Sequence, residues 1–256
     1  MKIDRATAIR QLLFARGHLT IPEIAEAVGA SEPTVRRDLA ALEMGGAITR
    51  SHGGARIADA SAAEIEFESR EQINLAAKRA IGEAAFARLH PHSAVFLDAG
   101  TTVLQLARLI RLRPLPLKVF TNCLPVAQHL MPVDGLSVTL LGGTLRRENA
   151  SMVGPLAEAA LADLWFDQLF LGVGAVGPDA AIYSADAHEA RINRLMLERT
   201  AAPVILTDSD KFGARLTHRV VGLAAGMQVI TDARLSAEWK ARLGEIGVDL
   251  ALAGGA

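Results

Sequence analysis

Hydrophobic residues follow two different spacings along this chain of 256 residues. Near the start they recur every three to four positions, as in amphipathic helices, and turn-forming residues separate these stretches. From residue 94 onward, short apolar runs alternate with further helical stretches. The first pattern predicts a small helical unit, and the second predicts a larger α/β unit with a mostly parallel sheet covered by helices on both faces.

The helical unit is expected to contain three short helices. Ile9, Leu12 and Leu13 share one face of the first helix. A capping box between Thr20 and Glu23 opens the second. The third follows after only a few residues, which is the spacing of a helix-turn-helix.

The third helix is expected to begin at Ser31, its N-cap, and to expose two arginines. A buried stripe turns Thr34, Arg36 and Arg37 toward other faces, and that stripe consists of Val35, Leu39 and Leu42. Arginine in this half of a recognition helix can hold a phosphate or read guanine in the major groove. A solvated charged face would also explain two arginines, so the pair alone does not decide between these roles.

The segment after the third helix favours DNA binding. Residues 47–55, "AITRSHGGA", place Arg50 and His52 at the tip of a predicted β-hairpin, and two glycines follow. This pattern is typical of the wing of a winged helix. For His52 a phosphate contact and a plain surface position both fit.

Residues 31–55, "SEPTVRRDLAALEMGGAITRSHGGA", resemble the winged helix of DeoR-type bacterial transcriptional regulators. One departure is Met44-Gly45-Gly46, where family members more often carry charged residues. The resemblance implies operator DNA as a partner. On this basis the expected DNA-contacting residues are Ser31, Thr34, Arg36, Arg37, Arg50 and His52.

The next part of the chain is predicted to connect two domains. Small, weakly patterned residues suit a linker, and residues 67–89 then read as one long helix. Its expected apolar face consists of Ile73, Ala77, Ile81, Ala84 and Ala85. We therefore expect a DNA-binding domain at residues 1–56, a connection at 57–75 and an effector-binding domain at 76–256.

The larger domain is predicted to contain seven strands, and polar residues follow several of them. The strand-like runs are "AVFLD", "LKVFTN", "SVTLLGG", "QLFLGVG", "PVILTD", "MQVITD" and "VDLALA". Ligands of open parallel sheets bind outside the carboxyl ends of the strands. The polar clusters at these ends therefore predict one shared site.

One of these ends is typical of a phosphate site. In "FLDAGTT" (residues 96–102), Gly100 allows close approach of a ligand, and Thr101 and Thr102 offer hydroxyls at the start of a helix. Thr101 could instead merely cap that helix. Lys211, in "DSDKFG" after another strand, favours the phosphate interpretation because it could neutralise the same anion.

The larger domain resembles the sugar-phosphate sensing domain of the same DeoR family, which is itself similar to ribose-phosphate isomerases. Motifs between residues 76 and 233 carry the resemblance: "KRAIGEAA", "FLDAGTT", "TNCLPVA", "LGGTLRRE", "VGPLAEAAL", "FLGVG" and "DSDKFG". It implies a phosphorylated sugar effector. The effector-binding residues implied are Asp98, Gly100, Thr101, Thr102, Thr121, Asn122, Gly142, Gly143, Glu189, Asp208 and Lys211.

Catalysis is not expected from this domain. Isomerases of the similar fold need carboxylates to move a proton, and this chain has Gly174 and Gly177 at the corresponding positions. Asp179 and Asp186 are nearby acids, for which a turn and a helix cap are the favoured roles. In "GGTLRRE", Arg146 and Arg147 could reach a phosphate, although exposed loop charges are favoured.

Composition narrows the remaining choices. The net charge is −1, whereas residues 1–56 carry eight Lys and Arg against six Asp and Glu. The single cysteine, Cys123, fits a reducing compartment. No apolar run is long enough to span a membrane, and no signal peptide is recognised, so we expect a cytoplasmic protein. No metal site and no cofactor are expected.

The sequence therefore predicts a DNA-binding regulator, most simply a repressor of a sugar operon, whose operator affinity is changed by a bound sugar phosphate. A homo-oligomer is expected because one winged helix reads few base pairs. The alternative from another class is a sugar-phosphate isomerase with a DNA-binding appendage. Activation instead of repression also remains open.

Overall fold

The structure, a computed structural model, describes residues 4–44, 48–51, 53–57, 67 and 69–254. The chain divides into two compact units, Met1–Ser69 and Arg70–Ala256. Six regular elements, counted within these residues, make up the first unit: three helices, a short strand and the two strands of a β-hairpin. They are α1 (Arg5–Arg16), β1 (Leu19–Thr20), α2 (Ile21–Val28), α3 (Glu32–Met44), β2 (Ile48–Ser51) and β3 (Gly54–Ile57).

A further helical stretch includes Phe67 and residues 69–72, at the boundary between the two units. In the first unit, β1, β3 and β2 form an antiparallel sheet in that order. The predicted helix-turn-helix and hairpin are therefore confirmed. The capping box is present as well, because the Thr20 amide donates to Glu23 Oε2 at 2.7 Å and the Glu23 amide donates to Thr20 Oγ1 at 3.4 Å.

The core of the first unit is apolar and draws on every element from α1 to β3. Ile9, Leu13, Ile24, Val35, Leu39, Ile48 and Ala55 are all buried. The second of the two wing glycines is required by packing. A Cβ on Gly54 would lie 2.4 Å from the Leu19 carbonyl oxygen, so only glycine lets β3 pair with β1.

The second unit is built on a seven-stranded parallel sheet with the order β15-β14-β12-β9-β4-β5-β6. All seven predicted strands are confirmed, and all lie in this sheet. Their bounds are β4 (Ala94–Leu97), β5 (Lys118–Thr121), β6 (Ser137–Leu140), β9 (Gln168–Gly172), β12 (Pro203–Leu206), β14 (Gln228–Asp232) and β15 (Asp249–Ala253). From β4 the chain first adds strands on one side and later, from β9, on the other.

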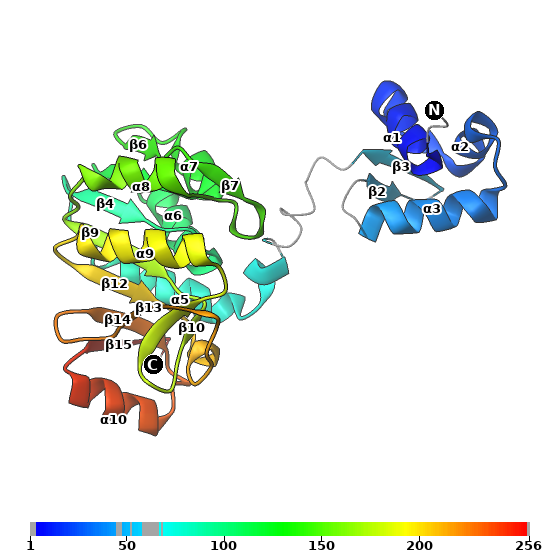
Figure 1. Ribbon diagram of the computed structural model, residues 1–256. Coiled ribbons are helices and arrows are strands. Elements are labelled where there is room, and N and C mark those ends of the chain that lie inside the picture. Colours follow the sequence, from blue (N-terminus) through cyan, green and yellow to red (C-terminus); the bar gives the residue numbers. More distant parts are fainter. Residues whose placement is uncertain (1–3, 45–47, 52, 58–66, 68, 255–256) are drawn as a thin grey trace. The chain divides into compact units, whose positions relative to one another are not determined.

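Helices cover both faces of this sheet (Figure 1). Helices α5 and α6 pack together on one face, and α8 and α9 pack together on the other. The helices of the unit are α5 (Leu75–Phe86), α6 (Thr101–Leu112), α7 (Leu124–Leu130), α8 (Pro155–Ala162), α9 (Ala187–Glu198) and α10 (Ala237–Ile246). Large apolar side chains, among them Phe96, Phe166 and Phe170, are fully buried between the layers.

Two smaller pieces of β-structure lie beside the main sheet. Three strands form an antiparallel sheet: β10 (Ala175–Val176), β11 (Ala181–Ser184) and β13 (His218–Gly222). A hairpin consists of β7 (Thr144–Arg146) and β8 (Ser151–Val153), with the 3-10 turn η1 (Arg147–Asn149) between them. A second 3-10 turn, η2 (Ser209–Lys211), follows β12.

The prediction of one long helix over residues 67–89 is wrong in one respect. The chain turns at Asn74, which has a left-handed backbone (φ 56°), and α5 begins only at Leu75. The expected face is correct at Ile81 and Ala85, which are buried, but Ile73 is 59% exposed. The turn at Asn74 takes the preceding residues out of the apolar stripe. Among the described helices, none is long and apolar enough to cross a membrane.

Candidate functional site

The predicted DNA-binding residues of α3 lie on its exposed side. Val35 and Leu39 are fully buried, whereas Arg36 and Arg37 are exposed. Arg36 pairs with Glu32 one turn earlier, at 3.1 Å. Near the start of the helix, the hydroxyls of Ser31 and Thr34 lie 2.9 Å apart.

The β-hairpin of the first unit, the predicted wing, carries another of the arginines expected to contact DNA. Arg50 lies on β2, where its amide donates to Glu43 Oε1 at 3.2 Å and its guanidinium lies 3.7 Å from Glu43 Oε2. This links the wing to the end of α3. His52 lies outside the described residues. The arrangement leaves arginines of both elements accessible to a polyanion.

In the second unit, the candidate site lies where the strand order reverses. Strands β4 and β9 are neighbours, but the chain leaves them in opposite directions along the sheet. Such a switch point is where open parallel sheets bind ligands. Asp98 follows β4, and its Oδ2 accepts a hydrogen bond of 3.2 Å from the amide of Gly172 at the end of β9.

Asp98 is a buried carboxyl at this switch point, with 3% of its surface exposed. Burial raises the pKa of Asp98 well above its usual value, and the nearby negative charge of Glu189 adds to the shift. Hydrogen bonds from the amides of Ala99 and Gly172 and from the Asn122 side chain oppose it. Asp98, Asn122 and Glu189, predicted from three separate segments, are therefore brought together.

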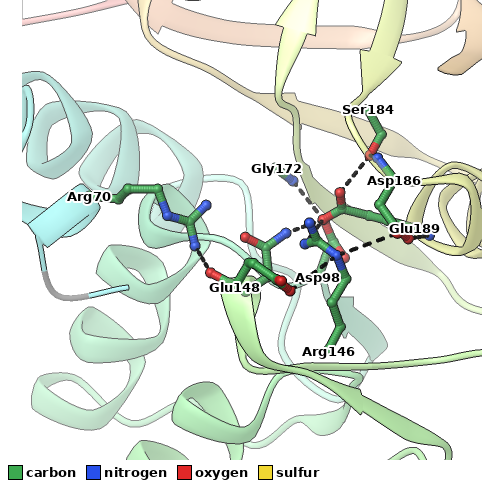
Figure 2. Close-up of polar contacts among 9 residues, drawn as sticks. Arg70, Asp98, Arg146, Glu148, Gly172, Ser184, Asp186 and Glu189 are labelled. Atoms are coloured by element: carbon green, nitrogen blue, oxygen red, sulfur yellow. Dashed lines mark hydrogen bonds and ion pairs between the residues drawn. The ribbon is translucent and has the colours of Figure 1, made fainter. Parts of the chain in front are cut away.

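Figure 2 shows Glu189 at the centre of a polar network. Its Oε2 accepts a hydrogen bond of 2.5 Å from Ser184, its Oε1 accepts one from Asn149, and Arg146 lies 3.8 Å from Oε1. Asp186 caps α9 as predicted, because its side chain accepts from the Glu189 amide at 2.9 Å. The hairpin β7–β8 thus contributes to the site through Arg146 and η1.

Arg146 differs from the exposed loop charge that the sequence favoured. Only 17% of its side chain is exposed, and it lies 3.6 Å from Glu148 and 3.8 Å from Asp186 in addition to Glu189. Sequence reasoning gave it no firm role because the hairpin that carries it is positioned by contacts with distant segments, such as the bridge between Ser151 and Cys123. No local pattern signals that contact.

A second group of polar residues surrounds the end of β12. Asp208 is buried, and its Oδ1 accepts from the Asn74 side chain at 3.1 Å. Lys78 of α5 is also buried, and burial lowers its pKa. The charge of Asp208 opposes this shift and that of Lys211 reinforces it, so these three side chains act on one another.

Lys78 was not predicted as a site residue, although the sequence contained a signal. It lies three residues before Ile81 and seven before Ala85, on the apolar stripe of α5. A lysine in a buried stripe is unusual unless it is paired. Lys211, the predicted cation, is exposed on η2.

The N-terminus of α6 lies directly after Asp98. Gly100 is the N-cap, and because glycine has no side chain, the N-cap residue makes no side-chain bond to the first turn. The alternative in which Thr101 caps the helix is therefore wrong. Uncapped amide groups and the positive end of the helix dipole suit an anion at this position.

Other predicted residues have structural roles that the sequence did not indicate. The Thr121 hydroxyl donates to the Leu97 carbonyl at 2.6 Å and accepts from the Cys123 amide at 3.0 Å, which ties β5 to β4. Gly143 (φ 148°) packs against β8, where a Cβ would lie 2.8 Å from the Val153 carbonyl oxygen. Gly142, in contrast, has open space beside it.

The two glycines at the expected acidic positions lie beside occupied space. A Cβ on Gly174 would lie 2.8 Å from Leu216 Cδ1, and a Cβ on Gly177 would lie 2.6 Å from the Tyr183 ring. A carboxylate at either position would need these side chains to move. In the described part of the chain, no group of three or more His, Cys, Asp or Glu could hold a metal ion.

Comparisons with known proteins agree with this division into units. Residues 5–61 match the DeoR-like helix-turn-helix domain, and residues 73–233 match the DeoR C terminal sensor domain. The chain belongs to the DeoR family of transcriptional regulators. The predicted resemblance is therefore confirmed for both parts of the chain.

Two relatives resemble the chain over most of its length. A putative aga operon transcriptional repressor of Escherichia coli O157:H7 is 34% identical over 98% of this chain and 94% of its own. A lactose phosphotransferase system repressor of Staphylococcus epidermidis is 34% identical over 83% of this chain and 84% of its own. Ribose 5-phosphate isomerase A of Methanocaldococcus jannaschii superposes with a TM-score of 0.40 at 14% identity, covering 54% of this chain and 55% of that one.

Proposed function

We propose that this DeoR-family regulator is a cytoplasmic repressor of a sugar operon, and that a phosphorylated sugar bound to its sensor unit changes its affinity for operator DNA. The names of two relatives support repression and sugar operons. Homo-oligomers would bind paired half-sites and so increase the contacts with the operator.

The observation that carries the effector proposal is the N-terminus of α6 at the carboxyl end of the sheet, the same end at which Lys211 follows β12 and Lys78 interacts with Asp208. The phosphate would lie on the first-turn amides and the hydroxyls of Thr101 and Thr102. Lys78 and Lys211 would supply opposite charge. The sugar hydroxyls would then meet acceptors at the switch point, where Asp98 and Glu189 lie close together.

An operator can be selected from random DNA duplexes and its binding followed by fluorescence anisotropy with a panel of phosphorylated sugars. We expect at least one of them to change the operator Kd by about 5- to 150-fold, and its unphosphorylated sugar to have little effect. Lys211→Ala and Thr101→Ala should bind operator normally but respond only at effector concentrations about 10- to 150-fold higher.

Lys118→Ala provides the matched control. Lys118 is exposed at the start of β5, at the end of the sheet opposite the carboxyl ends of the strands. This variant should respond as the wild type does. Full effector sensitivity in Lys211→Ala would contradict the phosphate assignment. A reporter gene behind the operator would separate repression from activation.

The proposed regulator has no isomerase activity. Side chains fill the space beside Gly174 and Gly177, and general acid–base groups typically supply a factor of about 10²–10⁴ in rate. We expect no conversion of ribose 5-phosphate by the purified protein. Turnover that disappears in Asp208→Ala or Lys211→Ala would make the protein an enzyme.

A further inference from the structure

Residues Arg70 and Glu71, which we call the clasp, begin the second unit directly after Ser69. The clasp is therefore the part of the second unit that follows the first unit most closely in sequence. Within the described residues, three elements contact the clasp, and each also contributes to the candidate effector site.

The first contact comes from Lys78. Its ammonium group donates a hydrogen bond of 2.5 Å to the Arg70 carbonyl oxygen. The same buried ammonium group is under the influence of Asp208 and Lys211. Lys78 thus contacts the clasp and is also one of the two lysines expected to neutralise a phosphate.

The second contact comes from α6, whose N-terminus opens the site. The Glu71 carboxylate accepts from both terminal nitrogens of the Arg108 guanidinium, with 3.1 Å between Oε2 and Nη2. Gln105 donates to Glu71 Oε1 at 3.3 Å. Glu71 is buried, so this paired arrangement fixes it firmly against the helix.

The third contact comes from η1 in the hairpin. Arg70 donates to the carbonyl oxygen of Glu148, as Figure 2 shows. The next residue, Asn149, donates to the Glu189 carboxylate, and Arg146 lies 3.8 Å from the same group. A change in the partners of Glu189 would therefore alter the position of the Glu148 carbonyl group, to which Arg70 donates.

We propose that the clasp is the route by which effector binding in the sensor unit reaches the DNA-binding unit. The proposal rests on the proposed function. A phosphate at α6 competes with the Arg70 carbonyl for the Lys78 ammonium group, and sugar hydroxyls compete with Asn149 for Glu189. Both exchanges weaken contacts of Arg70, so a single ligand shifts the clasp between a held and a released state.

The decisive variant is Arg70→Ala, measured for operator binding and effector binding separately. The coupling factor is the ratio of the operator Kd with effector to that without it. In the wild type it should differ from unity by about 5- to 150-fold, and in Arg70→Ala by no more than about twofold. Calorimetry should find the effector Kd of the variant within about threefold of the wild type.

Reciprocity gives an independent readout. In the wild type, bound operator should change the effector Kd by the same factor, and in Arg70→Ala it should leave that constant unchanged. Arg191→Ala is the matched control, because Arg191 makes an exposed pair with Glu158 at 3.5 Å on the opposite face of the sheet. Its coupling should equal that of the wild type.

A coupling factor of wild-type size in Arg70→Ala would refute the proposed role of the clasp and leave the proposed function intact. A wild-type protein whose operator binding ignores every sugar phosphate would overturn both. If Arg70→Ala does not fold, Glu71→Gln is the second variant, since it keeps the shape and loses the ion pair with Arg108. Unreduced coupling in a folded Glu71→Gln would then refute the clasp.

Discussion

In the first unit the arginines expected to meet DNA are exposed, and Arg36 is 61% exposed. In the second unit, by contrast, several polar side chains of the candidate site are buried. Asp98, Asn122 and Asp208 each expose at most 3% of their surface. The core of the first unit is apolar, whereas the second unit buries carboxylates, amides and a lysine beside its core.

This difference follows from the two expected ligands. DNA is a dense polyanion, and exposed arginines gain from the release of its counterions without being buried first. A small ligand offers few groups, so a site must hold its own polar groups in fixed positions. A low dielectric environment strengthens their interactions, but it also makes an unpaired group costly. The sensor unit should therefore be the more sensitive of the two to polar substitutions.

The largest effect is expected at Asp98. Replacing it with alanine removes the acceptor for the Gly172 and Ala99 amides and for the Asn122 side chain. Leaving such donors unpaired should lower the free energy of unfolding by about 2–4 kcal/mol. Urea unfolding of Asp98→Ala measures this loss.

Asp98→Asn is the matched control, because it keeps an acceptor oxygen without the buried charge. It should cost less than about 1 kcal/mol. Since the folded pKa of Asp98 is raised, its carboxyl contributes most below the unfolded value near 4, and the contribution falls as pH rises. Equal losses in the two variants would contradict this account.

The contribution of Asp232, at the end of β14, to stability is expected to depend on pH in the opposite direction to that of Asp98. Burial alone would raise its pKa, but hydrogen bonds from Arg234 and Ser209 outweigh burial and lower the pKa to about 2. The carboxylate therefore stabilises the fold above the unfolded pKa near 4, and this contribution is lost as pH falls toward 2.

Asp232→Asn should lower the free energy of unfolding by about 1–2 kcal/mol at pH 7, after allowance for solvent screening. Urea unfolding between pH 3 and 7 should show the difference from wild type shrinking toward low pH. A difference that grows on acidification would reverse the assigned sign.

The same contrast explains what the sequence could predict. Periodic burial and turn residues are local signals, and they identified all seven strands of the main sheet, the capping box at Thr20 and the cap at Asp186. The candidate site residues at strand ends followed from the parallel sheet. Asp98 and Asn122 were accordingly expected in one place, and Glu189 was added by the family resemblance.

The missed features depend on contacts between distant parts of the chain. Arg70 and Glu148 meet although 78 positions separate them, and no spacing rule relates them. The break at Asn74 carries no proline or glycine, so the helical pattern seemed to continue through it. Lys78 became a buried site residue only because α5 packs against α6.

The smallest effect on stability is expected on the exposed face of α3. The pair of Arg36 and Glu32 lies one turn apart in solvent, and such pairs contribute about 0.3–0.5 kcal/mol. Arg36→Ala and Glu32→Ala should therefore each change the free energy of unfolding by no more than about 0.5 kcal/mol. Thermal or urea unfolding of the full chain measures both.

The two variants should differ in their affinity for operator DNA although they have similar stability. Arg36→Ala should lower the salt slope of binding by about one if Arg36 holds a phosphate, or weaken binding by about 1–3 kcal/mol if it reads a base. Glu32→Ala removes a negative charge from the same face and frees Arg36, so binding should stay equal or tighten. Weaker binding in Glu32→Ala, with Arg36→Ala unchanged, would mean that α3 does not face DNA through Arg36.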